Sequence, residues 1–147
     1  MAVLGAILGV DPGREKCGLA LVDHRGTPII HEVVPSGQVV ETVQEWVVRF
    51  GNDFNIEAVV MGDRTSSQQW LTRWTEQLAT LDQLPAPQLI DEHNSTFEAR
   101  QVYWELYPPK GLKRLIPEGM RVPPRAIDDL AAVVLARRYL GTNVGTI

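Results

Sequence analysis

The hydrophobic pattern of the chain changes its period after Val34, and this change constrains the fold more than any other feature. Before Val34, short apolar runs alternate with turn residues, which is typical of β-strands. The expected strands cover residues 3–11, 17–22 and 27–34, with a hairpin turn at 23–26. The first run is continuously apolar, as in a strand that is buried on both faces. This part of the chain therefore predicts a three-stranded antiparallel meander.

After Val34, apolar residues recur at helical spacing, and the helical stretches alternate with strand-like runs. The expected helices cover residues 39–50, 70–81, from Ser95 to just before Pro108, and from near Pro124 to Gly141, and the expected strands cover 56–61 and 88–91. Ser95 and Glu98 form a capping-box pattern, and a proline suits the first turn of a helix. The order predicts an α/β fold whose mixed five-stranded sheet, with three antiparallel strands and then parallel strands, is flanked by helices. We expect a single domain spanning residues 1–147.

The composition is that of an ordinary globular protein, with 44% hydrophobic and 22% charged residues. Cys17 is the only cysteine, which excludes a disulfide framework or a Cys-rich zinc site within one chain. A reducing, cytoplasmic compartment fits this best. The apolar N-terminus reaches Asp11 too soon to span a bilayer and lacks the positive region of a signal peptide. We therefore expect no membrane partner.

Basic residues are concentrated in one segment, although the net charge of the chain is −4. Between Pro108 and Arg125 there are five basic residues and one acid, which leaves nine basic and seventeen acidic residues elsewhere. The basic residues of this segment are Lys110, Lys113, Arg114, Arg121 and Arg125. The acidic remainder argues against strong nonspecific binding of nucleic acid, but a polyanion can still bind one basic patch.

Acidic residues stand at three places that such a fold can bring together. Asp11 ends the first strand, Asp91-Glu92 end the fifth strand, and Asp128-Asp129 lie in the first turn of the last helix. Ligands in such sheets bind at the carboxyl ends of the parallel strands. A cluster of carboxylates repels itself unless a hard cation sits among them. Mg²⁺ bound in this way suits phosphodiester chemistry.

Each acidic place also has a purely structural reading. Asp11 precedes Pro12-Gly13 and, taken alone, fits a turn residue better than a site. Asp91-Glu92 fit loop charges, and Asp128-Asp129 fit acids that a helix N-terminus favours. Their joint position at one edge favours a site over three separate structural roles.

Three blocks of the sequence read LGVDPGREKCGLA over residues 8–20, DEHNSTFEAR over 91–100 and IDDLAAVV over 127–134. Together they resemble the YqgF/RuvX family, in the RuvC branch of RNase H-like nucleases. The family's second block usually reads Asp-Glu-Arg-Leu-Thr-Thr followed by an acidic-Ala pair, and its third block is an Asp before an Ala-rich helix. The blocks occur in the family's order, and the resemblance spans nearly the whole chain.

The resemblance implies an RNase H-like fold and metal-dependent cleavage of phosphodiesters. Family members are described as Holliday junction resolvases and as nucleases that mature the precursor of the small-subunit ribosomal RNA. By position, Asp11, Glu92 and Asp128 would be the catalytic carboxylates. Asp11 and Asp128 would hold Mg²⁺ or Mn²⁺, and Glu92 would hold the metal or orient the attacking water. The partner would be branched DNA or precursor ribosomal RNA, and a homodimer would suit a two-fold substrate. The sequence does not choose between DNA and RNA.

The chain departs from the family pattern beside the second acid. His93 replaces the usual Arg and Asn94 the usual Leu, which removes a strong phosphate contact that a protonated His93 could partly restore. Asp63 ends the fourth strand and is either an alternative ligand to Glu92 or a cap for a helix that starts at Ser66-Ser67. Asp91 and Asp129 are further alternatives to the carboxylates beside them. These departures keep a second hypothesis open, a noncatalytic nucleic-acid-binding or scaffold protein with the same fold.

Other residues near these blocks have a functional and a structural reading. Arg14 and Lys16 follow Asp11 in its turn, where they would contact a phosphate or simply face solvent. Trp104 precedes the basic segment, where base stacking is possible but core packing fits better. Trp70 lies on an apolar helical stripe, and Cys17 starts a strand. We expect both to be buried in the core.

Overall fold

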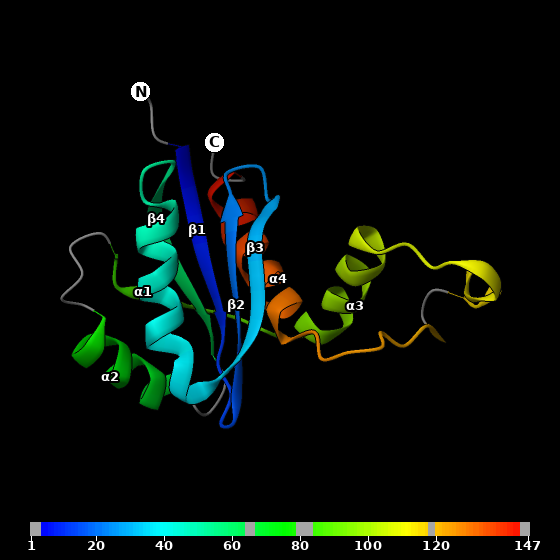
Figure 1. Cartoon of the computed structure of the whole chain (residues 1–147), viewed down its shortest axis with the longest axis horizontal. Coiled ribbons are helices and arrows are strands. Elements are labelled where there is room, and N and C mark those ends of the chain that lie inside the picture. Colours follow the sequence, from blue (N-terminus) through cyan, green and yellow to red (C-terminus); the bar gives the residue numbers. More distant parts are fainter. Residues whose placement is uncertain (1–3, 64–66, 79–83, 118–119, 145–147) are drawn as a thin grey trace.

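The computed structural model describes residues 4–63, 67–78, 84–117 and 120–144 and contains a five-stranded sheet of order β3-β2-β1-β4-β5 (Figure 1). The strands are β1 (Leu4–Asp11), β2 (Lys16–Asp23), β3 (Pro28–Pro35), β4 (Phe54–Gly62) and β5 (Pro87–Ile90). β2 pairs antiparallel with both β1 and β3, whereas β4 pairs parallel with β1 and β5. The predicted mixed α/β sheet is confirmed.

Helices cover both faces of this sheet. They are α1 (Val39–Phe50), α2 (Ser67–Gln77), α3 (Ser95–Leu106) and α4 (Asp128–Val144), with short 3-10 turns at η1 (Ser36–Gln38) and η2 (Gly111–Leu115). The buried core of α1 and α2 packs on one face, and that of α3 and α4 packs on the other. Figure 1 shows α4 lying behind the central strands, on the side opposite α1.

The central strand β1 sends alternate side chains into the two cores. Leu8 and Val10 join the core under α1 and α2, whereas Ile7 joins the core under α4. Both faces of β1 are therefore buried, which explains why its sequence is continuously apolar rather than alternating. The same alternation places Asp11 on the α4 face, because side chains two residues apart in a strand share one face.

The last helix begins later than its sequence pattern predicts. It starts at Asp128 rather than near Pro124, and it continues past Gly141 to Val144. The amides of Leu130 and Ala131 both donate to the carbonyl of Ile127, which makes Ile127 the first acceptor of the helix. The preferred first-turn position of proline was thus a poor guide here. The predicted end of the second helix, near Leu81, lies outside the described residues.

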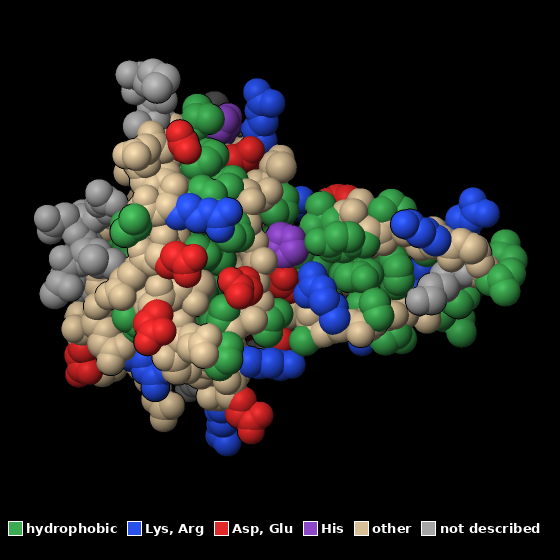
Figure 2. All heavy atoms as spheres, in the orientation of Figure 1, with side chains coloured by type: hydrophobic (Ala, Val, Ile, Leu, Met, Phe, Trp, Pro, Cys, Tyr) green, Lys and Arg blue, Asp and Glu red, His purple; other side chains and the backbone are tan. Residues whose placement is uncertain are grey.

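The described part of segment 107–127, which we call the arm, extends away from the sheet between α3 and α4 (Figure 1). Its large apolar side chains face solvent, with Leu112 83% and Leu115 80% exposed. Tyr107, Ile116, Met120 and Val122 are also exposed. Figure 2 shows hydrophobic and basic side chains together over the arm, whereas acidic side chains stand out over the sheet and α1. Exposed apolar side chains gathered in this way mark an interaction surface.

Within the described ranges, no helix combines the length and the apolar character needed to cross a membrane. Trp70, Trp104 and Cys17 are buried, as predicted for core residues.

Candidate active site

Asp11 lies at the carboxyl end of the central strand and is buried, with 5% of its surface exposed. Its partner across the antiparallel pair is Gly18 of β2. Residues directly opposite each other in such a pair point to the same face of the sheet. The Asp11 side chain and a Cβ atom added to Gly18 would therefore both point toward α4.

Asp128 begins α4 directly on top of Gly18. A Cβ atom added to Gly18 would lie 1.8 Å from the carbonyl oxygen of Asp128 and 2.6 Å from the amide nitrogen of Asp129. Only a glycine permits so close an approach of helix and strand. The first turn of α4 is thus set beside the strand position that pairs with Asp11.

Glu92 lies on the other side of Asp11, over the end of β4. Val10 pairs with Met61, so the next residue, Gly62, lies beside Asp11. A Cβ atom added to Gly62 would lie 2.6 Å from Oε2 of Glu92. The carboxyl group of Glu92, which is 8% exposed as a residue, therefore occupies the space that Gly62 leaves open.

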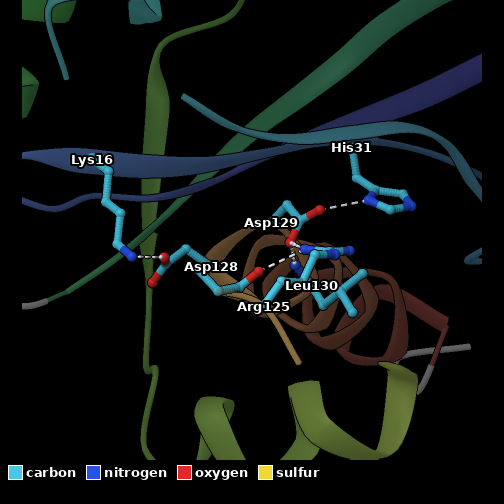
Figure 3. A network of polar contacts seen from close by, with 7 residues as sticks. Lys16, His31, Arg125, Asp128, Asp129 and Leu130 are labelled. Atoms are coloured by element: carbon cyan, nitrogen blue, oxygen red, sulfur yellow. Dashed lines mark hydrogen bonds and ion pairs between the residues drawn. The ribbon is translucent and has the colours of Figure 1, made fainter. Parts of the chain in front are cut away.

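The three predicted carboxylates thus converge on one face and one edge of the sheet. Asp11 lies between Gly18, which supports Asp128, and Gly62, which supports Glu92. Among the residues that the structure describes, no three Asp, Glu, His or Cys side chains are grouped closely enough to hold a metal ion. Instead, Oδ2 of Asp128 lies 3.6 Å from Nζ of Lys16 (Figure 3). The convergence of backbone positions is present, but the three carboxylates are not grouped as metal ligands.

Asp129 points away from this edge and belongs to a separate buried network (Figure 3). Its Oδ2 lies 2.6 Å from Nδ1 of His31, and its Oδ1 accepts hydrogen bonds from Arg125 and from the amide of Leu130, both at 3.0 Å. Burial alone would raise the pKa of Asp129, but the hydrogen bonds and charges of His31 and Arg125 outweigh burial and hold that pKa below its usual value. These contacts assign Asp129 a structural role.

The other two alternative acids, Asp63 and Asp91, bind backbone amides near Glu92. Oδ1 of Asp63 accepts from the amide of Glu92 at 3.4 Å, and Oδ1 of Asp91 accepts from the amide of His93 at 2.9 Å. Both side chains are exposed. The second contact is an Asx-turn, which orders a loop without any ligand. Asp63 was also a predicted cap for a helix starting at Ser66-Ser67, but Ser66 lies outside the described residues.

Asn94 suits its position for a conformational reason. It adopts the left-handed backbone conformation, with φ at 61°, immediately before α3. Asn tolerates that region far better than Leu does. The predicted start of α3 at Ser95 is confirmed, but the predicted capping box is wrong. The cap residue is Asn94, which makes no side-chain cap hydrogen bond, and the Glu98 carboxylate binds Arg138. His93, expected beside the acids, is exposed.

The turn after Asp11 is held by hydrogen bonds from Ser36 and Trp70, a role that the sequence pattern did not reveal. The carbonyl of Gly13 accepts hydrogen bonds from Oγ of Ser36 at 3.1 Å and from Nε1 of Trp70 at 3.2 Å. The amide of Gly13 donates to Sγ of Cys17 at 3.4 Å. Burial raises the pKa of the Cys17 thiol, which keeps this sulfur protonated at neutral pH. These contacts hold Gly13, and with it the turn that directly follows Asp11, in one position.

The predicted phosphate-binding residues fall into two groups. Arg14 and Lys16 are exposed on the turn beside Asp11. Those of the arm are separate: Lys110, Arg114 and Arg125 are exposed, Arg121 is half-buried, and Lys113 lies in η2 with its side chain outside the description. The arm leads into Asp128, and its last basic residue, Arg125, contacts Asp129 in the first turn of α4 at 3.0 Å.

Arg138 is the residue near the site that the sequence analysis missed. It reaches from α4 to the turn that carries Glu92 and donates to the carbonyls of Asp91 and His93, both at 2.6 Å. No local pattern signals this contact, because its partners lie 47 and 45 residues away in the chain.

Comparison with known proteins identifies the fold. No protein-family model and no curated protein matches the chain. The structure is similar to that of T. thermophilus RuvC in complex with a Holliday junction substrate, with a TM-score of 0.62, 17% sequence identity and coverage of 96% of both chains. A second Thermus thermophilus RuvC structure gives a TM-score of 0.56 at 18% identity, covering 96% of this chain and 97% of that one. The predicted RNase H-like architecture is therefore confirmed, and the chain has the fold of RuvC.

Proposed function

We propose that this protein is a metal-dependent nuclease of the YqgF type that cleaves structured nucleic acid, either branched DNA or precursor ribosomal RNA. The observation that carries the proposal is the placement of Asp11 between two glycines that support Glu92 and Asp128. Three acidic residues from distant parts of the chain converge there, and neighbouring carboxylates repel one another unless a positive charge offsets them. The RuvC protein of similar fold was determined with a Holliday junction substrate, which motivates the class of substrate.

The donor atoms at this edge fit Mg²⁺ or Mn²⁺. Both are hard cations that bind carboxylate oxygens, and Asp11 and Glu92 are buried where such a charge would offset their repulsion. For Asp128 to join them, its carboxylate must leave Lys16, an exposed ion pair that costs little to break. A bound ion would supply a water of lowered pKa and a positive charge beside the leaving oxygen. Asp11, Glu92 and Asp128 would orient that ion against the phosphodiester.

The arm and the turn after Asp11 would bind the nucleic-acid backbone. Lys110, Arg114 and Arg121 have no carboxylate partner within the described residues, since the two arginines donate to backbone carbonyls. Their positive charges therefore remain available to phosphates. Lys16 would contact a phosphate once Asp128 leaves it. A homodimer, which suits a two-fold substrate, and a cytoplasmic location are part of the same proposal.

The decisive test is Asp11→Asn, assayed on branched DNA and on precursor ribosomal RNA with Mg²⁺ and with Mn²⁺. We expect cleavage to fall by more than about 100-fold, beyond the range seen for residues that only support metal ligands. Asp53→Asn is the matched control, because Asp53 is an exposed carboxylate at the opposite end of the sheet, beside the start of β1. Equal cleavage by the Asp11 variant and the control would refute the assignment.

A noncatalytic nucleic-acid-binding protein is the second candidate. It is favoured by the pairing of Asp128 with Lys16 and by the absence, among the described residues, of a group of side chains ready to hold a metal. This candidate predicts no cleavage and no stabilisation by metal. A rise of the melting temperature in Mn²⁺ that disappears in Asp11→Asn would exclude it, because only a ligand bound to the folded state raises stability in this way.

A further inference from the structure

Arg138 binds the backbone on both sides of Glu92. Its Nη1 donates to the carbonyl of Asp91 and its Nη2 to the carbonyl of His93, each at 2.6 Å. The same guanidinium reaches Oε2 of Glu98 at 2.7 Å from Nη2 and 3.2 Å from Nε. The planar fork of a guanidinium is suited to hold several acceptors at fixed angles. Two peptide groups that bracket Glu92 are thus tied to one side chain of α4.

The turn that carries Glu92 lies at the edge of the sheet, where Arg138 adds to the contacts within the turn itself. The strand before it, β5, has four residues and lies at the edge of the sheet, paired only with β4. The residue after His93 is Asn94 in the left-handed conformation, which interrupts regular structure. Within the turn, the amide of Glu92 donates to the exposed Asp63 at 3.4 Å and the amide of His93 donates to Asp91 at 2.9 Å. The carbonyl of Glu92 accepts from the amide of Ser95 at 2.9 Å. The charge-assisted hydrogen bonds of Arg138 tie this turn to α4, whereas the others connect it to its own residues and to the residue after β4.

Helix α4 contains Asp128 and also Arg138, so one helix positions Asp128 directly and Glu92 through the contacts of Arg138. Asp128 lies in its first turn, against Gly18, and Arg138 lies ten residues further along. We propose that Arg138 is a positioning residue that sets Glu92 relative to Asp11 and Asp128, and thereby sets the affinity of this edge for a divalent cation. This inference rests on the proposed function, because it assigns Glu92 to the metal site.

Arg137, the next residue along α4, provides a matched control. It also connects α4 to α3, through Glu105 at 3.2 Å, and it also donates to a turn carbonyl, that of Gly26 at 2.8 Å. Gly26 lies in the hairpin turn between β2 and β3, away from Glu92. Replacing either arginine removes an α3–α4 ion pair and a backbone contact, but only Arg138 holds the turn of Glu92.

The test compares Arg138→Gln with Arg137→Gln in the full chain. Hydrogen exchange measured by mass spectrometry reports the turn directly, and titration with Mn²⁺ alone, followed by electron paramagnetic resonance, reports cation affinity. We expect Arg138→Gln to speed exchange over residues 91–95 and to weaken Mn²⁺ binding by about 10- to 100-fold, the range for residues that orient metal ligands. Arg137→Gln should change neither quantity by more than about 2-fold, since it leaves the same turn untouched.

Two further variants keep the inference testable. Arg138→Lys retains the charge but not the fork, so it should restore Mn²⁺ affinity only partly, and it replaces the glutamine variant if that protein does not fold. Glu98→Gln removes the ion pair but keeps both carbonyl contacts, and it should leave Mn²⁺ affinity closer to that of the wild type. Full recovery by Lys would overturn the geometric role.

The outcomes separate this inference from the proposed function. If Mn²⁺ binds equally to the wild type and to Asp11→Asn, the metal site is wrong, and the positioning role falls with it even where exchange over 91–95 increases. If Asp11→Asn abolishes binding while the Arg138 and Arg137 variants bind Mn²⁺ equally, the metal site stands and the role of Arg138 is overturned. Weaker binding only in the Arg138 variant supports both.

Discussion

The carboxyl edge of the sheet and the arm present opposite arrangements of charge and packing. At the edge, Asp11 and Glu92 are buried, and the backbone of α4 approaches Gly18 so closely that no side chain fits between them. In the arm, Leu112 and Leu115 are almost fully exposed beside basic residues (Figure 2). The edge is built for fixed geometry, and the arm for contact with another molecule.

The difference indicates how a nuclease of the proposed kind would divide its parts. Acids that share a cation need positions fixed to within a fraction of an ångström, which only packed elements provide. Cations that bind phosphates act over longer distances and tolerate a mobile scaffold. Substitutions should therefore affect stability at the edge and binding in the arm, and three predictions test that division.

The largest effect is expected for Gly18→Ala at the edge. The added Cβ would lie 1.8 Å from the carbonyl of Asp128, a backbone atom that can move away only if the start of α4 moves with it. We expect a loss of about 3 kcal/mol in the free energy of unfolding, at the upper end of the usual cost of overpacking. Denaturant unfolding followed by circular dichroism measures it.

Gly37→Ala is the control for that substitution. Gly37 lies in η1, and an added Cβ meets no atom within 4 Å. Its unfolding free energy should stay within about 0.5 kcal/mol of the wild type, as for most surface substitutions. Similar losses in both variants would mean that the contact between Gly18 and Asp128 does not limit the packing of α4.

The sequence predicted the sheet well because the signals for it are local. The continuous apolar run before Asp11 and the hairpin turn at 23–26 each follow from neighbouring residues. The change to helical spacing after Val34 is also a local signal, and the alternation of helices and strands that follows it correctly predicted parallel strands. The start of α4 was misplaced because Pro124 is compatible with a first turn, whereas the actual start depends on where the helix meets Gly18.

The candidate site was predicted only in outline, because its details depend on contacts between distant residues. Asp128 and Asp129 are equivalent in a local pattern, and their roles differ through contacts such as that of Asp129 with His31, 98 residues away in the chain. Arg138 could not be found for the same reason, since it binds turn carbonyls more than forty residues away. Long-range geometry of this kind has no periodic signal in one sequence.

A smaller effect is expected at Asp129, where the arm joins the sheet through Arg125. Asparagine at this position keeps the shape of the side chain but removes the charge that faces His31 and Arg125. We expect Asp129→Asn to lower the free energy of unfolding by about 2 kcal/mol, within the usual cost of disrupting a buried charged hydrogen bond. Thermal and denaturant unfolding measure this loss.

Asp128→Asn is the adjacent control: it should change stability little but should abolish any stabilisation by Mn²⁺. Its ion pair with Lys16 is exposed, with 35% of the Asp128 side chain accessible, so stability should change by less than about 1 kcal/mol. Any rise of the melting temperature in Mn²⁺ should nevertheless be lost. If Asp128→Asn were the more destabilising of the two, the division between a structural and a functional acid would be wrong.

The smallest effect on stability, and the sharpest test of the arm, is expected for the double variant Lys110→Gln and Arg114→Gln. Both side chains are exposed, so the melting temperature should not change. If each binds one phosphate, the slope of log affinity for branched DNA against log salt concentration should fall by about 2 in magnitude. Arg49→Gln, an exposed cation on α1 that lies over the Phe50 ring, should leave that slope unchanged. A slope that stays the same in the arm variant would show that Lys110 and Arg114 do not contact phosphates.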